Sequence, residues 1–191
     1  MTVQPSRCGW CGTDPLMVAY HDHEWGRPSH DDRRLFEAVV LDGFQAGLSW
    51  STIMKKRENF RRAFDHFDAE KIARYNSKKL GSLLKDAGII RNRMKIEAAV
   101  VNAKAFLKTQ EQFGSFDKYI WQFTGYKTIH NRWKHLKQIP FSTKLSDAMS
   151  KDMKQRGFRF CGTTICYAFM QAVGMVNDHL IGCFCYDEIA G

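Results

Sequence analysis

Cysteines and histidines gather near both ends of this chain. The segment RCGWCGTDPLMVAYHDHEWG (residues 7–26) contains Cys8 and Cys11, a Cys-x-x-Cys spacing typical of half a zinc ribbon or of a redox motif. The segment NDHLIGCFCY adds His179 and Cys183. A structural zinc ion takes four Cys and His ligands in tetrahedral geometry, so these residue types could form a metal site.

One candidate ligand set joins the two ends of the chain through Cys8, His21, His179 and Cys183. The four-residue spacing of His179 and Cys183 would place both side chains on one face of a helical turn. Because such a tie closes a loop of about 175 residues, it would restrict the unfolded chain by about 4–5 kcal/mol. The alternative is that these are ordinary buried thiols and surface histidines. Spacing alone also leaves three competing ligands: Cys11, His23 and Cys185.

The sequence argues against a catalytic zinc. The segment HEWGR lacks the second histidine of H-E-x-x-H, since Arg27 stands in its place. A nucleobase deaminase would need H-x-E followed by P-C-x-x-C, but here Glu24 directly follows His23 and the Cys-x-x-Cys precedes both. We therefore expect any zinc to be structural.

Length and charge bound the class of protein. The chain has 191 residues, 44% of them hydrophobic, which fits one sizeable domain or two small lobes. Its net charge of +9 favours an anionic partner, with nucleic acid or a membrane surface first. We see no apolar signal peptide and no stretch of about 20 apolar residues that could span a membrane. A cytoplasmic location is expected, where six cysteines serve as thiols or ligands rather than disulfides.

Apolar residues recur mostly at intervals of three and four, which predicts an all-α fold. Alternating strand patterns are scarce, and residues 126–141 form a basic segment without a clean apolar stripe, which we expect to be a loop. Gly43 and Gly88 are placed as helix stops. The predicted helices cover residues 31–43, 49–64, 77–88, 94–112, 115–123, 143–157 and 162–174.

The segment KDAGIIRNRMKIEAA (residues 85–99) joins two helical stripes through a tight turn that contains glycine. Such a turn can direct backbone N–H groups at a phosphate, and nearby cations add salt-sensitive affinity. The pattern is similar to a helix-hairpin-helix, although Ile90 stands where a second glycine is usual; a solvated helical corner is the alternative. The candidate DNA-backbone contacts are Gly88, Arg91, Arg93 and Lys95.

The segment LDGFQAGLSW (residues 41–50) combines an acid, small residues, an apolar residue and a tryptophan between two predicted helices. A loop that enters a duplex needs small residues for close approach and an apolar wedge. A pocket for a flipped base needs an aromatic surface and a polar group for the base edge. Trp50, Asp42 and Tyr20 meet that second need. The alternative is a helix-joining loop with a buried tryptophan.

Taken together, these stretches resemble one family, 3-methyladenine DNA glycosylase I, whose bacterial members act in base-excision repair. The matching stretches are RCGW, DPLMVAYHDHEWG, LFEAVVLDGFQAGLSWSTIMKKRENFRRAF, DAGIIRNRMKIEA and GFRFCGTTICYAFMQAVGMVNDHLIGC, in family order from Arg7 to Cys183. The resemblance implies an all-α, helix-hairpin-helix fold with a structural zinc that joins the two termini. It implies one glycosylase unit over residues 1–191, with a zinc lobe from 1–30 and 160–191 and a hairpin lobe at 35–115.

The resemblance also assigns roles to single residues. Trp50 matches the tryptophan that stacks against the excised base, and Tyr20 matches the pocket tyrosine. Leu48, Gly47 and Gln45 fall in the loop that probes the DNA. Thr163 and Thr164 fall in a GTT stretch near the pocket. The implied zinc ligands are Cys8, His21, His179 and Cys183, with Cys11 and His23 as bystanders.

One position departs from the family pattern, since Asp42 stands where the family carries a glutamate that recognises the methylated base. The carboxyl is retained, but its reach is shorter by one C–C bond, about 1.5 Å. This bears on the affinity and selectivity for the lesion more than on the reaction class.

The implied activity is hydrolysis of the N-glycosidic bond of 3-methyladenine in double-stranded alkylated DNA, by a monofunctional enzyme that acts as a monomer. Asp42, Tyr20 and Trp50 are the implied catalytic group. A zinc-stabilised DNA-binding protein of the same fold without turnover is the second hypothesis. A cytosolic zinc-containing regulator that binds protein partners is the third, and it would have no salt-dependent affinity for DNA.

Overall fold

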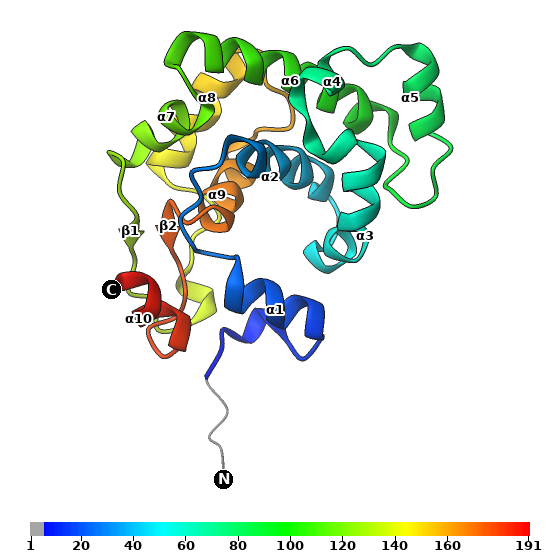
Figure 1. Cartoon of the computed structure of the whole chain (residues 1–191). Coiled ribbons are helices and arrows are strands. Elements are labelled where there is room, and N and C mark those ends of the chain that lie inside the picture. Colours follow the sequence, from blue (N-terminus) through cyan, green and yellow to red (C-terminus); the bar gives the residue numbers. More distant parts are fainter. Residues whose placement is uncertain (1–5) are drawn as a thin grey trace.

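A computed structural model describes residues 6–191 and shows a mostly helical molecule, as the periodicity predicts (Figure 1). Short 3₁₀ turns cover Gly9–Cys11, Asp65–Phe67, Gln122–Thr124 and Leu136–Gln138. The α-helices are α1 (Pro15–His23), α2 (Asp32–Gln45), α3 (Trp50–Ala63), α4 (Ala69–Ala73), α5 (Ser77–Leu83), α6 (Arg93–Phe113), α7 (Phe116–Trp121), α8 (Lys144–Gln155), α9 (Thr163–Ala172) and α10 (Phe184–Ala190).

Polar residues begin the three helices that follow one another from the N-terminal side. Asp14 accepts a hydrogen bond from the backbone N–H of Leu16 at the start of α1, which also has proline at its first position. Asp31 caps α2 and Ser49 caps α3 in the same way. Such caps satisfy N–H groups that have no partner inside the helix, so the local sequence determines where these helices start.

Two strands were not expected from the sequence. β1 (Ile129–His130) pairs in parallel with β2 (Val176–Asn177), with Ile129 opposite Val176. Each strand has only two residues, too few to show the alternation by which a strand is recognised. The pair joins the basic segment, expected to be a loop, to the chain that leaves α9.

Three local expectations are wrong. Gly43 does not stop α2, which continues to Gln45; an added Cβ at Gly43 would lie 3.3 Å from the Cβ of Phe160, so the glycine permits close packing instead. The helix predicted to reach Gly88 ends at Leu83, and Gly88 lies in the loop after it. The segment from His179 to Cys183 is a turn rather than a helix.

The main hydrophobic core extends from Leu35 in α2 to Val176 in β2 and includes the long helix α6 and the helix α9. A smaller cluster contains Met17, Tyr20 and Trp25 together with Met54 of α3. Segments from near both ends of the described chain pack against each other around three buried cysteines: Cys8, Cys183 and Cys185. In the described part of the chain, no helix is long and apolar enough to cross a membrane.

Ion pairs connect α1, α2 and α3. Arg57 of α3 lies 2.6 Å from Glu37 of α2 and 2.7 Å from Glu24, which follows α1. Arg61, one turn further along α3, lies 2.9 Å from Glu37. These side chains are half-buried or buried, so solvent screens them less than it screens exposed pairs. They fix the relative positions of the three helices that carry Tyr20, Asp42 and Trp50.

Gly174 offers a test of backbone packing. It has φ +75°, and an added Cβ would lie 2.4 Å from the backbone of Arg27 and Pro28. Gly125 also has a positive φ, of +64°, but nothing lies within 4 Å of its added Cβ. We expect Gly125→Ala to lower the free energy of unfolding by about 1–2 kcal/mol and Gly174→Ala to lower it by about 3 kcal/mol or more, because the second change adds a clash. Urea denaturation measures both; equal losses would contradict the packing argument.

Candidate functional site

A cavity of about 260 Å³ lies among α1, α2, α3 and α9. Trp10, Tyr20, Trp25 and Trp50 give it aromatic walls. Its polar lining comes from Asp42, Gln45 and Gln171. The structure therefore brings Tyr20, Asp42 and Trp50 together as the sequence predicts, from three different helices, and it adds Gln45, which was expected in the DNA-probing loop.

The aromatic rings surround the space from several directions. The rings of Tyr20 and Trp50 have centroids 5.5 Å apart and planes inclined by 47°. Trp10 and Trp25 meet edge to face, with centroids 4.9 Å apart. Trp50 is the first residue of α3, so its ring position is determined by the start of that helix. Flat apolar walls of this kind suit a planar aromatic ligand.

Asp42 is buried in this apolar setting, with 4% of its surface exposed. Burial alone raises the pKa of its carboxyl from 3.8 to about 8, because burial disfavours the charged form. At neutral pH the carboxyl is therefore mainly the neutral acid. Tyr20 is also buried, and burial together with the nearby Asp42 raises the pKa of its phenol well above 10.0.

Unpartnered polar atoms concentrate at this cavity. Within residues 6–191, four buried side-chain N or O atoms make no hydrogen bond, and three of them belong to cavity residues: Trp10 Nε1, Asp42 Oδ2 and Trp50 Nε1. Buried polar groups nearly always have partners, and the exceptions call for an explanation. A ligand with hydrogen-bonding groups at its edge would supply the missing partners.

The loop after α2 presents an exposed leucine. Gln45 closes the loop on itself, since its Nε2 donates to the Leu48 carbonyl at 2.7 Å and its own carbonyl accepts from the Leu48 N–H at 2.7 Å. Gly47 takes φ +79°, which allows the tight turn. Leu48 is 37% exposed at the tip. Gly47 and Leu48 lie beside the cavity rather than in its lining.

Lys95 was predicted to contact the DNA backbone, but the structure places it inside the protein. Its side chain is buried, and its Nζ donates to the carbonyls of Phe44 at 2.8 Å and Ala46 at 2.5 Å. These are carbonyls at the end of α2, where a helix lacks internal partners and favours a cation. Burial lowers the pKa of Lys95. Lys95 therefore caps the helix that carries Asp42, and its ammonium does not face a phosphate.

The other predicted DNA contacts lie around the loop between α5 and α6. Arg91 and Arg93 are exposed, and Arg93 lies 3.5 Å from Glu97 on the same helix. The Gly88 N–H donates to Asp86 Oδ1 at 2.7 Å, so it is already used within the loop.

Thr163 and Thr164, at the start of α9, do not line the cavity. Thr163 Oγ1 bonds to Asp147 and to Ser146 Oγ, both in α8, while Thr164 is exposed. The pocket role predicted for these threonines therefore has no counterpart in the cavity lining.

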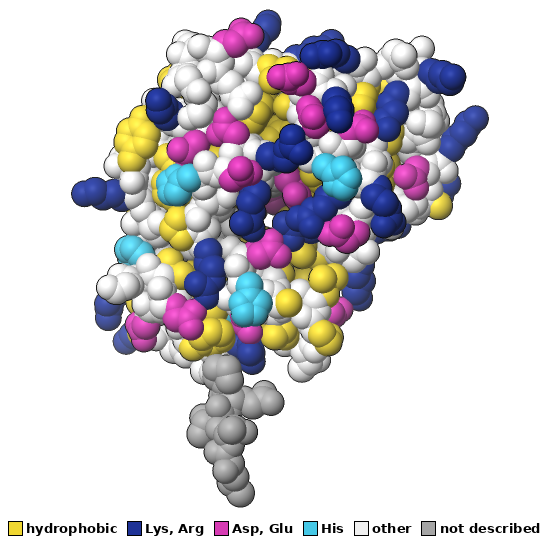
Figure 2. Space-filling view, viewed as in Figure 1, with side chains coloured by type: hydrophobic (Ala, Val, Ile, Leu, Met, Phe, Trp, Pro, Cys, Tyr) yellow, Lys and Arg dark blue, Asp and Glu magenta, His cyan; other side chains and the backbone are white. Residues whose placement is uncertain are grey.

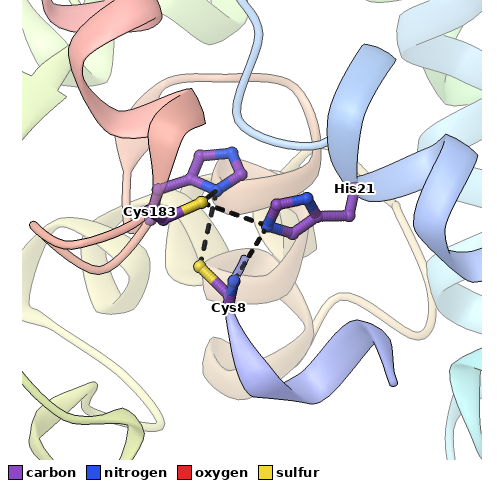
Figure 3. A group of neighbouring side chains, drawn as sticks. Cys8, His21 and Cys183 are labelled. Atoms are coloured by element: carbon purple, nitrogen blue, oxygen red, sulfur yellow. Dashed lines mark hydrogen bonds between the residues drawn. The ribbon is translucent and has the colours of Figure 1, made fainter. Parts of the chain in front are cut away.

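The four predicted zinc ligands meet at the opposite end of α1 from its start, and all four are buried (Figure 3). Cys183 Sγ lies 3.4 Å from His21 Nε2 and 3.5 Å from His179 Nδ1. Cys8 Sγ also lies 3.5 Å from His179 Nδ1. The candidate ligand atoms lie within 4.8 Å of one another.

Neighbouring groups orient both imidazole rings. His21 Nδ1 lies 2.7 Å from Asp22 Oδ1, and Arg7 in turn holds that carboxylate. His179 Nε2 lies 3.0 Å from the Trp25 carbonyl. Each ring thus directs its remaining nitrogen at the cysteines, the arrangement common around metal-binding histidines.

Two of the three competing residues separate from this group. Cys11 Sγ donates to the Cys8 carbonyl at 3.1 Å, and His23 is exposed. Cys185 stays beside the group, since it packs with Cys8 and Cys183 and its Sγ lies 3.9 Å from His21 Nδ1, in a second group with His21 and Asp22.

Sequence reasoning missed Trp10, Trp25 and Gln171 as cavity residues. Each comes from a different segment, and none has a spacing to another pocket residue that marks it. Trp10 and Trp25 do lie within four residues of proposed zinc ligands, which is the signal that could have found them.

The pKa of Asp42 gives a stability prediction. The folded-state pKa of Asp42, about 8, exceeds the ordinary 3.8. The contribution of the protonated carboxyl to the free energy of unfolding is therefore fully present below pH 4 and is lost as the pH rises through 8. Asp42→Asn removes this loss. The difference in free energy of unfolding between this variant and the native chain should shift in favour of the variant as the pH rises from 4 to 8, by at most about 1.36 kcal/mol per pH unit. Denaturant titrations at several pH values measure the difference; a pH-independent difference would contradict the assignment.

Comparison with known proteins places the chain among base-releasing enzymes. The sequence model of the methyladenine glycosylase family matches residues 10–186. The chain is 51% identical over 180 residues to DNA-3-methyladenine glycosylase 1 of Escherichia coli (strain K12), covering 94% of this chain and 96% of that protein.

Solved structures agree with the sequence comparison. A crystal structure of 3-methyladenine DNA glycosylase I superposes with a TM-score of 0.91 at 51% identity, covering 94% of this chain and 99% of the other. A second, of a variant of such an enzyme in complex with 3-methyladenine, has a TM-score of 0.91 at 34% identity, with coverage of 93% and 96%. Fold and sequence together show that this chain belongs to the methyladenine glycosylase family.

Proposed function

We propose that this protein hydrolyses the N-glycosidic bond of 3-methyladenine in alkylated double-stranded DNA, releasing the free base and leaving an abasic site. The observation that carries the proposal is the buried, unpartnered carboxyl of Asp42 in a cavity walled by aromatic rings. A related enzyme of the same fold binds 3-methyladenine.

The chemistry of the substrate explains why so few catalytic groups are needed. Methylation at N3 makes the adenine cationic, so the base departs as a neutral molecule and the bond to C1′ is already weak. Asp42 is the single acid in the cavity lining, and it serves base recognition. The reaction then consists of extruding the nucleotide, holding the base and admitting water at C1′, without a lysine intermediate.

The cavity residues match the edges and faces of the base. The Trp50 ring offers a stacking surface at the cavity wall, beside Tyr20. Adenine presents N7 as an acceptor and its N6 amino group as a donor. A neutral carboxylic acid carries one donor and acceptor capacity, so the Asp42 carboxyl can meet both. A bound cationic base lowers the pKa of Asp42, and the ionised carboxylate then keeps the hydrogen bond from N6 but has no proton to donate to N7.

Features outside the cavity support binding to DNA. The exposed Leu48 at the tip of a loop held by Gln45 fits an apolar wedge that fills the space of an extruded base. We propose that α5, α6 and their loop form a helix-hairpin-helix, in which Arg91 and Arg93 attract the phosphates. Figure 2 shows Lys and Arg side chains spread over one face among carboxylates, in a chain of net charge +9.

We also propose a structural zinc held by Cys8, His21, His179 and Cys183. Zinc at its usual bond lengths in a tetrahedron places sulfur and nitrogen ligands about 3.5 Å apart. The S–N distances of 3.4 to 3.5 Å in the structure fit this geometry. The ion would supply a fixed tie between the two termini and take no part in the chemistry at the base.

A DNA-binding protein of this fold without turnover is the second candidate. One observation favours it: position 42 carries an aspartate rather than the longer glutamate expected for the family. The shorter side chain would leave its carboxyl farther from a base that stacks on Trp50.

Base release is the test of the proposed activity. We expect the protein to release 3-methyladenine from methylated DNA and Trp50→Ala to lower the rate by about 5- to 150-fold, because stacking on one aromatic ring is worth about 1–3 kcal/mol. Chromatography of the released bases measures both. The Asp42→Glu variant run beside it shows whether reach limits the native chain. No release by the native protein would favour the non-enzymatic candidate.

Zinc binding has its own test. Cys8→Ser should lower the bound zinc from one ion per chain toward zero, because it removes one of four ligands, and should reduce the free energy of unfolding by about 4 kcal/mol as the loop constraint is lost. Cys11→Ser is the matched control and should retain the metal, since its thiol points at a backbone carbonyl. Metal analysis of purified proteins measures the content. Loss in Cys11→Ser alone would overturn the ligand assignment.

A further inference from the structure

Gln171 is a polar residue of the cavity whose role neither the sequence motifs nor the reaction outlined above explains. It lies near the end of α9 and lines the same cavity as Asp42 and Trp50. Its backbone carbonyl accepts from the Gly26 N–H at 3.0 Å, which ties this part of α9 to the segment after α1. Its position is therefore determined by the fold.

The side-chain amide of Gln171 is held in one orientation. Its Nε2 donates to Asp178 Oδ2 at 2.8 Å. The same carboxylate accepts from the Tyr167 hydroxyl at 2.7 Å on Oδ2, and from Asn131 Nδ2 and Trp133 Nε1 at 2.7 and 2.8 Å on Oδ1. Four donors therefore surround Asp178, which is 1% exposed.

This arrangement decides which end of the amide is free. All four side-chain contacts at the Asp178 carboxyl are donated to it, and the fourth donor is Gln171 Nε2. The NH₂ group of Gln171 must therefore face Asp178, and the carbonyl oxygen must point elsewhere. Among the described residues Oε1 receives no hydrogen bond, yet it is not one of the fully buried unpartnered atoms. It is thus an accessible acceptor on a residue that lines the cavity.

We propose that Gln171 Oε1 accepts a hydrogen bond from the N6 amino group of the bound base, which makes Gln171 a residue that selects 3-alkyladenine over purines with an oxygen at C6. This inference rests on the proposed function and names its specificity. Adenine carries a donor at this position, whereas guanine carries the acceptor O6. An acceptor fixed by Asp178 cannot turn to offer its NH₂ group without breaking the bond to the carboxylate. A base with O6 would place two acceptors against each other.

A pair of free bases tests the proposal directly. The ligands are 3-methyladenine and 3-methylhypoxanthine, which differ in having NH₂ or O at C6. Quenching of tryptophan fluorescence reports their dissociation constants. The native protein should prefer 3-methyladenine by about 5- to 150-fold, since an unmatched buried polar group costs about 1–3 kcal/mol. Gln171→Met keeps the length of the side chain without its acceptor, so the preference should fall about 10-fold.

Tyr167→Phe is the matched control, because it removes a different donor from the same Asp178 oxygen and does not line the cavity. It should keep the native preference; thermal unfolding of both variants confirms that they are folded. If Tyr167→Phe loses the preference to the same extent, or if Gln171→Met keeps it, the inference is overturned. If the native protein binds neither base, the proposed function itself fails, and the two failures are thereby distinguished.

Discussion

The central constraint in this structure is the burial of a carboxyl group without a partner. Asp42 lies among aromatic rings, where its Oδ2 has no hydrogen bond and its pKa rises to about 8. Such a group opposes folding at neutral pH, because either an ionised or an unsatisfied carboxyl is removed from water. Interactions elsewhere in the fold must offset this destabilising contribution of Asp42. A site kept at such a cost is typical of ligand binding.

The compensating interactions lie on the helices that carry the cavity residues. Arg57 joins α3 to α2 through Glu37 and to the end of α1 through Glu24. Lys95 reaches from α6 to the last carbonyls of α2, just beyond Asp42. The buried ammonium of Lys95 thus joins α6, part of the proposed hairpin, to α2, the helix that carries Asp42. Each of these charges finds opposite charge or carbonyl oxygens, so their burial is satisfied where that of Asp42 is not.

The terminal cluster and the cavity share one segment. Tyr20 lines the cavity, and the next residue, His21, faces Cys183. Trp25 does both, since its ring lines the cavity and its carbonyl orients His179. Whatever holds the two termini together therefore also positions an aromatic wall. Asp178, which orients Gln171, directly precedes His179, so the position of the Gln171 amide at the cavity depends on the same turn.

The sequence by itself determined the helical class and most helix starts, because periodicity and capping are local properties. The group Tyr20, Asp42 and Trp50 was predicted from residue types and from the family resemblance, since no local pattern brings three helices together. The convergence of Gln171 on the cavity and the inward turn of Lys95 were decided by the tertiary structure alone. Both side chains are directed by partners distant in sequence, a carboxylate beyond β2 for one and the carbonyls of α2 for the other. No spacing within a segment encodes such partners, since they meet only when the helices pack.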